Sequence, residues 1–179
     1  MVLLQGVKIR LRPLEQDDVR DIYRMVNDPN IAGEFDAFQL ASWGEVEKWF
    51  REEIGPNEFT VFIIERNEDK AKLGIVVYYT VHPVMQNIEI GFQLHSENER
   101  NKGYGTEAVK LIVEYLFLTR NMQRIQATTD VGNLASQRVM EKNGFVKEGE
   151  MRKALFRNGS FHNTYFYSIL RDEWSNISA

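Results

Sequence analysis

A short glycine-rich segment in the second half of the chain combines residue types that bind phosphate groups. In NERNKGYGTEAVKLIVEYLF, residues 98–117, the spacing is Arg100-x-x-Gly103-x-Gly105, and a helical pattern of apolar residues follows. Glycine lets backbone N–H groups approach an anion closely, and the start of a helix adds partial positive charge. Arg100 and Lys102 add full charges. The segment predicts a phosphate-binding turn; the alternative is a solvated loop with ordinary turn glycines.

Two common nucleotide-binding motifs do not fit this turn. A Walker loop needs Gly-x4-Gly-Lys-Ser/Thr, and Gly105 with Thr106 is not preceded by that frame. The Rossmann fingerprint G-x-G-x-x-G/A matches Gly103, Gly105 and Ala108, but a Rossmann turn directly follows its strand, early in a βαβ unit. Here SENERNK separates the turn from the strand before it, and three strands come in succession. We therefore reject both motifs.

The elements that must position the turn are placed by their residue patterns. Alternating or β-rich segments predict strands at 7–14, 59–66, 72–81, 87–95, 124–129, 145–156 and 164–170. Helical spacing and caps, including a capping-box pattern at Ser42 and Glu45, predict helices at 17–28, 42–54, after the glycine turn, and at 133–144. The order is β-α-α-β-β-β-α-β-α-β-β, which predicts an α+β fold with a mixed sheet between helical layers.

The length, net charge and cysteine content of the chain restrict the classes of protein to which it can belong. The chain has 179 residues, which favours a single domain over 1–179, and a net charge of −4, which suggests neither a nucleic-acid nor a membrane surface. It has no cysteine, so disulfides, thiolate metal sites and a cysteine acyl-enzyme are excluded. The first residues lack the pattern of a signal peptide, and no apolar stretch approaches the roughly 18 residues that span a bilayer. We expect a cytoplasmic protein.

The glycine turn after a strand resembles the pyrophosphate loop of the GNAT superfamily of acetyl-CoA-dependent N-acetyltransferases. LRPLEQDD, NLASQRVMEKNGF and EGEMRKALFRNGS…YFYSIL resemble the branch that contains the ribosomal-protein N-terminal (RimJ/RimL-type) acetyltransferases, and together the likeness spans residues 7–174. The resemblance implies a GNAT fold, with a twisted, mostly antiparallel sheet. Its fourth and fifth strands would splay apart around the pantetheine arm of coenzyme A, and Gly91 or a nearby bulge would help to open that gap.

On the cofactor side, the resemblance implies acetyl-CoA as co-substrate and no metal. Backbone N–H groups would cradle the pyrophosphate along Arg100, Asn101, Lys102, Gly103, Tyr104, Gly105 and Thr106. Backbone groups would pair with the pantetheine and hold the thioester carbonyl at Phe92, Gln93 and Leu94. Asn133 would contact the pantetheine, although it also suits a helix cap. Arg138 would reach the ribose phosphate, or it belongs to a solvated helix face.

The acceptor amine must be neutral to attack, so a general base helps. Glu89 on the fourth strand is our candidate, directly or through water, and the alternative is an outward-facing strand glutamate. By resemblance Ser136 donates a hydrogen bond or proton to the departing thiolate. Glu34 and Asp36, between the first two helices, are candidates for recognising a cationic substrate. Without a cysteine nucleophile we expect direct attack in a ternary complex.

The identity of the acceptor is the least readable feature. Overall similarity favours a protein N-terminal α-amino group, of the kind found on ribosomal proteins. A polyamine such as spermidine, or another small amine, is the alternative, and a non-catalytic acyl-CoA-binding regulatory module is a third possibility. We expect no nucleic-acid or membrane partner, and the chain is either a monomer or a homodimer. Asn163 stands where many relatives carry an aspartate, which alters charge recognition if that position contacts substrate.

Overall fold

A seven-stranded sheet forms the centre of the computed structural model, which describes residues 4–35, 38, 40–55, 59–82 and 87–178. The strands are β1 (Ile9–Pro13), β2 (Phe59–Arg66), β3 (Lys72–His82), β4 (Asn87–Leu94), β5 (Arg124–Asp130), β6 (Val146–Arg157) and β7 (Ser160–Leu170). Their order across the sheet is β1-β2-β3-β4-β5-β7-β6, and all neighbours are antiparallel except β4 and β5. This confirms the mixed, mostly antiparallel sheet.

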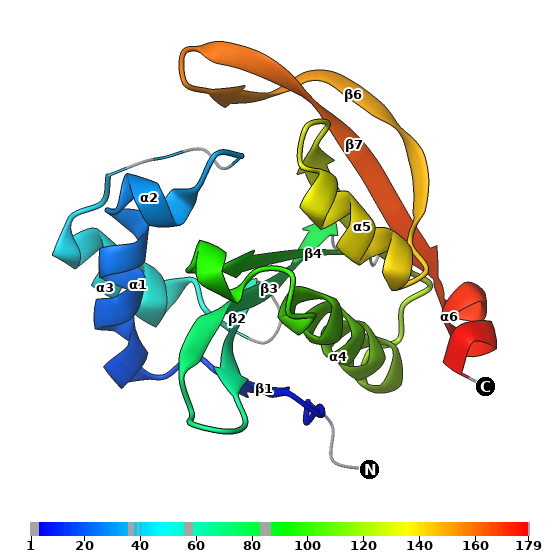
Figure 1. Ribbon diagram of the computed structural model, residues 1–179, viewed down its shortest axis with the longest axis horizontal. Coiled ribbons are helices and arrows are strands. Elements are labelled where there is room, and N and C mark those ends of the chain that lie inside the picture. Colours follow the sequence, from blue (N-terminus) through cyan, green and yellow to red (C-terminus); the bar gives the residue numbers. More distant parts are fainter. Residues whose placement is uncertain (1–3, 36–37, 39, 56–58, 83–86, 179) are drawn as a thin grey trace.

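Helices cover both faces of the sheet. They are α1 (Val19–Val26), α2 (Pro29–Ala32), α3 (Trp43–Glu52), α4 (Tyr104–Thr119), α5 (Leu134–Lys142) and α6 (Arg171–Ser178), with short 3-10 turns η1 (Gln16–Asp18) and η2 (Glu97–Glu99). Figure 1 shows α1, α2 and α3 on one side of the central strands and α4 and α5 on the other, with the long β6–β7 hairpin passing above α5. The α+β prediction is confirmed. None of the helices in the described ranges is long and apolar enough to cross a membrane.

Two helices were not predicted. The first, α2, has only four residues, too few for a periodic pattern to reveal. Asp28 caps it by accepting the N–H of Asn30 at 2.9 Å, and Pro29 occupies its first turn. This Asp-Pro pair was the available sequence signal. The other missed helix, α6, follows β7 without a break.

Two apolar clusters show which side each strand residue faces. The cluster under α4 and α5 includes Ile88 and Ile90 of β4, whereas the cluster under α1 and α3 includes Val77 of β3, the register partner of Gly91. Side chains alternate along a strand. The odd-numbered residues of β4, among them Glu89, therefore face the α1 side.

Local sequence signals account for two boundaries near the site. Ser42 and Glu45 form the predicted capping box at the start of α3, each side chain accepting the other's backbone N–H. At the end of the β6–β7 hairpin, Asn158 (φ 48°) and Gly159 (φ 77°) are both left-handed. Two left-handed residues match the twist of antiparallel strands in a tight hairpin, and Asn-Gly is a residue pair that such a turn favours.

Candidate active site

β4 and β5 pair over two positions only and then separate. The paired residues are Ile88 with Ile125 and Glu89 with Gln126. Beyond Glu89, β4 continues to Leu94 and pairs with β3 alone among the described strands. The divergence that the resemblance implied is therefore present, and it begins at Glu89.

The backbone of Phe92, Gln93 and Leu94 forms one wall of this gap. Its other edge pairs in register with β3, so the edge toward β5 is left for a ligand. We expected Gly91 or a nearby bulge to help open the gap. No bulge interrupts β4 from Glu89 to Leu94, which pairs with β3 in continuous register. A Cβ on Gly91 would come within 3.2 Å of a Val77 methyl group. This glycine permits close packing of β4 on β3 and does not bend the strand.

The glycine turn enters α4 through left-handed backbone. Asn101 has φ 62° and Gly103, the N-cap of α4, has φ 88°. The first helical hydrogen bond runs from Glu107 N to Gly103 O, so the N–H groups from Gly103 to Thr106 precede it and lack intrahelical partners. A Cβ on Gly105 would lie 3.2 Å from the ring of a β4 phenylalanine. Free donors and a compact turn fit a pyrophosphate group.

The cationic side chains of this turn each have an acidic partner. Arg100 Nη1 lies 3.1 Å from Glu97 Oε1, and Lys102 Nζ lies 3.0 Å from Glu99 Oε2. We predicted these charges as additions to the field of the turn, and the structure corrects this, because each is matched by a carboxylate three residues earlier. Such partly exposed pairs are weak and exchange partners at little cost. The turn's preference for anions therefore rests on its backbone.

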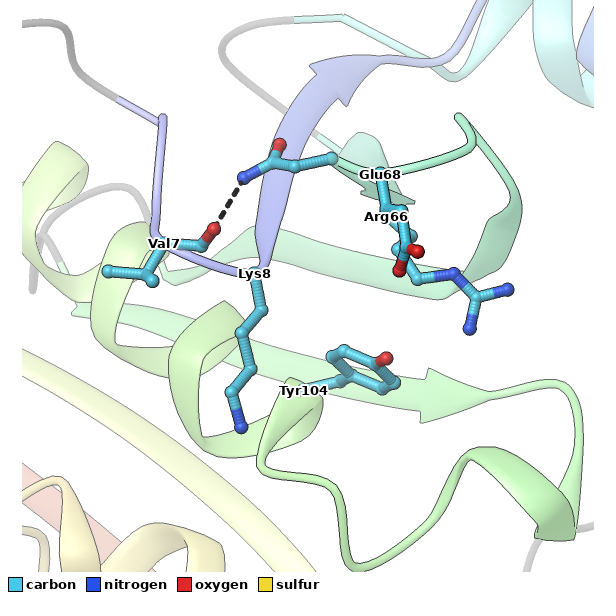
Figure 2. Close-up of a pocket in the computed structure, with 6 residues that line it drawn as sticks. Val7, Lys8, Arg66, Glu68 and Tyr104 are labelled. Atoms are coloured by element: carbon cyan, nitrogen blue, oxygen red, sulfur yellow. Dashed lines mark hydrogen bonds between the residues drawn. The ribbon is translucent and has the colours of Figure 1, made fainter.

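A lysine from the start of the chain also reaches this turn. Lys8 Nζ donates a hydrogen bond to the Lys102 carbonyl oxygen at 2.8 Å. Figure 2 shows its side chain extending toward the first turn of α4, beside Tyr104. Lys8, Arg66 and the buried Tyr104 line a cavity of about 410 Å³ next to the turn. Sequence reasoning missed Lys8, because nothing in its local pattern indicates a contact with a turn over ninety residues away.

Asn133, Ser136 and Arg138 lie at the start of α5. Asn133 Oδ1 accepts the backbone N–H of Ser136 at 3.1 Å, which confirms the helix cap. Ser136 is half-buried, and Arg138 is exposed on the same helix. The far end of α5 is tied to the glycine turn, because Asn143 Nδ2 donates to the Thr106 carbonyl at 3.2 Å. The C-terminal end of α5 therefore contacts the start of α4, and Asn133 caps α5 three residues after the end of β5.

Glu89 lies where the gap begins, on the face of the sheet toward α1. Its carboxylate accepts hydrogen bonds from Gln126 Nε2 and Thr128 Oγ1, both at 3.0 Å. The Tyr79 hydroxyl, opposite it on β3, also hydrogen-bonds it; burial, with the charge of Glu89, raises the pKa of Tyr79 well above its usual value. Three groups thus orient this carboxylate. Ser136, the other predicted catalytic residue, lies in the first turn of α5, a helix that packs with α4 on the opposite face of the sheet.

Residues 31–35, which we call the α2 loop, cross the open end of the gap. The Ile31 carbonyl accepts a hydrogen bond from Gln93 Nε2 on β4 at 3.1 Å. Four residues later, the Phe35 ring lies 5.4 Å from the guanidinium carbon of Arg157 on β6. A Cβ on Gly132, just after β5, would lie 3.3 Å from the same ring. The α2 loop therefore connects β4 to the end of β5 and the hairpin.

The acidic residues near the α2 loop differ in their surroundings. Glu34 lies in the loop and is exposed, whereas Asp36 lies outside the described residues. A carboxylate that we had not singled out, Asp130 at the end of β5, is 6% exposed and lies 3.1 Å from Arg157, itself 8% exposed. His162 Nδ1 lies 3.9 Å from the same carboxylate. The negative charge of Asp130 is therefore neutralised by Arg157. We refer to the α1 side of the gap, where this pair lies, as the acceptor side.

Asn163 is explained by its neighbours in the hairpin. Its Oδ1 accepts the backbone N–H of Lys153, which lies in an irregular part of the β6–β7 pairing, at 2.8 Å. Its Nδ2 donates to Glu150. An aspartate at this position would place a second negative charge beside Glu150, so the amide matches its partner.

Comparisons with known proteins agree with this geometry. Residues 8–146 match the family model of the acetyltransferase (GNAT) domain. A Bacillus subtilis protein provisionally named ribosomal N-acetyltransferase YdaF is 33% identical over 106 residues, 59% of this chain and 57% of the relative. The spermidine N(1)-acetyltransferase of Vibrio cholerae is 25% identical over 171 residues, 96% of this chain and 98% of the relative.

One solved structure extends the match to the whole fold. The crystal structure of spermidine N-acetyltransferase from Vibrio cholerae in complex with CoA and spermine superposes with a TM-score of 0.83 at 24% identity. The alignment covers 96% of this chain and 100% of that one. The family model ends at the first residue of β6, so the hairpin with Arg157 and Asn163 lies outside it.

Proposed function

The chain belongs to the GNAT acetyltransferase family, and from this premise we propose that it transfers the acetyl group of acetyl-CoA to the N-terminal α-amino group of a protein. Acetyl transfer from acetyl-CoA to an amine is the activity of the family. The finer proposal concerns the acceptor and the roles of individual residues. We propose that the protein is a RimJ/RimL-type enzyme and that it acts in the cytoplasm.

The observation that carries this choice of acceptor is the ion pair between Asp130 and Arg157. A polyamine has several cationic groups, and its recognition needs several carboxylates without cationic partners. On the α1 side of the gap, Asp130 is neutralised by Arg157. Glu89, at the start of the gap, has no cationic partner within the described ranges, and one carboxylate at this point suits a substrate with one amine.

Acetyl-CoA supplies an acetyl group activated as a thioester. Glu89 accepts a proton from the attacking amine, directly or through one water, as the nitrogen–carbon bond forms and the carbon–sulfur bond breaks. Backbone N–H groups of the segment Phe92 to Leu94 hold the carbonyl oxygen as negative charge develops on it. Ser136 donates its hydroxyl hydrogen bond to the leaving thiolate. With no cysteine in the chain, the transfer is direct and needs both substrates bound together.

The demand on Glu89 depends on the acceptor. An α-amino group has a reference pKa of about 7.7–8.0, so a useful fraction is neutral near pH 7, whereas a lysine-like amine at about 10.4 is almost fully protonated. An α-amino acceptor therefore needs less help from the base. Tyr79, Gln126 and Thr128 support Glu89 by holding its carboxylate in one orientation.

The cofactor fits the other side of the gap. The N–H groups that would surround the pyrophosphate are those of Asn101, Lys102, Gly103, Tyr104, Gly105 and Thr106. Arg100, which we had included, donates its N–H to the Glu97 carbonyl at 3.0 Å. Asn133 keeps its side-chain oxygen on the helix cap and retains its amide N–H₂ for the pantetheine. Arg138 is exposed and reaches the ribose phosphate from α5.

A polyamine is the second candidate acceptor. It is supported by the relative that is named a spermidine N(1)-acetyltransferase and matches nearly the whole chain. Exposed Glu34 in the α2 loop, and Asp36 after it, would then contact the additional ammonium groups. This alternative requires carboxylates beyond Glu89 to face the acceptor.

The test is release of free thiol from acetyl-CoA in the presence of four acceptor classes: N-terminal peptides, spermidine, free amino acids and an aminoglycoside. We expect the largest kcat/KM for a peptide with a free α-amino group, and none for the same peptide with a blocked N-terminus. Preference for spermidine would replace the first acceptor with the second. Binding of CoA without turnover of any acceptor would favour a regulatory acyl-CoA-binding module.

A further inference from the structure

We propose that Lys8 is a positioning residue for the pyrophosphate-binding turn, which aims the Gly103 N–H group at the cofactor. A side chain of the segment before β1 contacts the backbone of the glycine turn, and a side chain of the first turn of α4 contacts the backbone of that segment. This inference rests on the proposed function, because it concerns how the chain binds acetyl-CoA. It assigns a role to a residue more than ninety positions away from the glycine motif.

In each of the two segments, a side chain hydrogen-bonds with the backbone of the other segment. Lys8 Nζ donates to the Lys102 carbonyl at 2.8 Å. In return the carboxylate of Glu107, in the first turn of α4, accepts the backbone N–H groups of Val7 and Lys8, the latter at 3.2 Å from both oxygens. A Cβ on Gly6 would come within 2.3 Å of Glu107 Oε1, so only glycine allows this approach. The glycine turn is therefore held from outside as well as by its own backbone.

The backbone of Lys8 is also fixed from its other side. Asn67, in the turn between β2 and β3, donates its backbone N–H to the Lys8 carbonyl at 2.9 Å. The side chain of Asn67 donates to the carbonyls of Gly6 and Val7, both at 3.0 Å. The dashed line in Figure 2 shows the bond to Val7, with the Lys8 side chain reaching away from it toward α4. Lys8 thus extends from an anchored strand and holds the turn in a defined place.

The direction of the Lys102 carbonyl decides where the next N–H group points. In a trans peptide the C=O and the N–H of the following residue point in opposite directions. Because the Lys102 carbonyl points at Lys8, the Gly103 N–H points away from Lys8. The opposite side of the turn is the inner one, where Gly105 packs against Phe92 of β4 and Val139 of α5.

A glycine on one side makes this peptide easy to rotate. Gly103 has φ 88° and tolerates both signs of φ, so little resists a flip of the peptide that precedes it. A flipped peptide would turn the Lys102 carbonyl oxygen toward the phosphate and remove one N–H donor. Lys8 opposes this flip, because its ammonium group holds the carbonyl on the outer side.

The alternative is that Lys8 contacts the ribose 3′-phosphate of the cofactor directly. Coenzyme A carries a pyrophosphate and a ribose 3′-phosphate, and dephospho-CoA lacks only the latter. A residue that positions the turn must affect binding of both molecules equally. A residue that contacts the ribose phosphate must affect CoA alone.

The experiment is a calorimetric titration of the wild type, Lys8→Met and Lys8→Arg with CoA and with dephospho-CoA. Methionine keeps the length of the side chain and removes the donor, and arginine keeps a charged donor. Lys110→Met, at an exposed position of α4, is the matched control for loss of one positive charge. Thermal unfolding of each variant, with and without CoA, reports whether the fold is intact.

We expect Lys8→Met to weaken both ligands by the same factor of about ten, the size of one hydrogen bond from a charged group. Lys8→Arg should recover most of that loss, and Lys110→Met should lose less than twofold. With an active acceptor, KM for acetyl-CoA should rise while kcat at saturation stays unchanged. A purely structural role would lower the unfolding temperature without this split.

Three results would overturn the inference. They are unchanged affinity of Lys8→Met for both ligands, a loss confined to CoA, and a loss that Lys110→Met reproduces. A wild-type protein that binds neither ligand would instead refute the proposed function, which is a different outcome. If Lys8→Met is poorly folded, equal affinities of Lys8→Arg and Lys8→Gln for CoA would contradict the role.

Discussion

The two sides of the gap between β4 and β5 are made from different kinds of groups. On the α4 side, the candidate ligand-binding groups are backbone N–H groups of one continuous turn, from Asn101 to Thr106. On the α1 side, they are side chains from separate segments: Glu89 on β4, Phe35 in the α2 loop and Arg157 in the hairpin. The first set depends on local conformation and the second on the packing of distant elements.

This difference has a functional consequence. A cofactor shared by a whole family can be bound by backbone N–H groups, which tolerate changes in side chains. An acceptor that varies between relatives must be recognised by side chains, which can change without disturbing the turn. The family model covers the turn, the α2 loop and Glu89, and it ends at the first residue of β6.

The largest effect should come from Glu89→Gln. Loss of the general base should lower kcat at pH 7 by about 10³-fold, within the range for removal of such a group, while the Kd for CoA changes less than twofold. The deficit should shrink as pH rises, because more of the amine becomes neutral without a base. The measurement is a pH–rate profile for both proteins, with Glu53→Gln, at an exposed position after α3, as control. Equal turnover of Glu89→Gln and the wild type at every pH would exclude Glu89 from the mechanism.

Gly103→Val tests the backbone side of the comparison. Valine is strongly disfavoured at φ 88°, and a Cβ at this position would lie 3.5 Å from Lys8 Nζ. We expect CoA affinity to fall at least about 10²-fold, the size of a strained residue plus lost N–H donors. Gly149→Val is the control, because a Cβ there meets open space in a strand. Normal CoA binding by Gly103→Val would refute the assignment of the turn.

The cofactor side could be predicted from sequence because its signals are local. The spacing Arg100-x-x-Gly103-x-Gly105, the helix after it and the cap at Asn133 each depend on residues close together in the chain. The residue that was missed on this side, Lys8, lies just before β1 and far from the glycine turn in the sequence. The opening of the gap likewise follows from diverging strands and needs no special residue at Gly91.

The acceptor side could not be predicted in the same way. The pair Asp130–Arg157 and the contact of Phe35 with Arg157 join residues that lie far apart, and each residue alone has an ordinary pattern. Glu89 was found because its strand position was readable, but its partners Gln126 and Tyr79 come from two other strands. The ion pairs and hydrogen bonds of the acceptor side could therefore be identified only from the three-dimensional structure.

Arg157→Met should sharpen the contrast between the two acceptors. It frees the carboxylate of Asp130 beside the α2 loop, so the ratio of kcat/KM for spermidine to that for an N-terminal peptide should rise about tenfold. Leaving Asp130 buried and unpaired should also cost about 3 kcal/mol in the free energy of unfolding. Acceptor kinetics below the unfolding transition measure the first effect and urea denaturation the second. Arg152→Met, exposed on the same strand, is the control, and an unchanged ratio would mean that Asp130 does not face the acceptor.

Tyr79→Phe should have the smallest effect and tests how Glu89 is held. The change removes one of three hydrogen bonds to the carboxylate and leaves those from Gln126 and Thr128. We expect kcat to fall about fivefold, the size of one such bond, with no change in the Kd for CoA. Because burial raises the pKa of Tyr79, its hydroxyl keeps its proton above pH 10, so the wild-type rate should show no alkaline decline from this residue.

The matched control for this change is Tyr115→Phe, at a half-buried tyrosine of α4 on the other face of the sheet. If Tyr79 acts through Glu89, the double variant Tyr79→Phe with Glu89→Gln should be no slower than Glu89→Gln alone, because the hydrogen bond then has no base to orient. Independent, multiplying losses would show that Tyr79 supports the acceptor side in another way. Because Tyr79 comes from β3 whereas Gln126 and Thr128 come from β5, equal small losses at each would mean that the orientation of one carboxylate is shared between the two strands that flank β4.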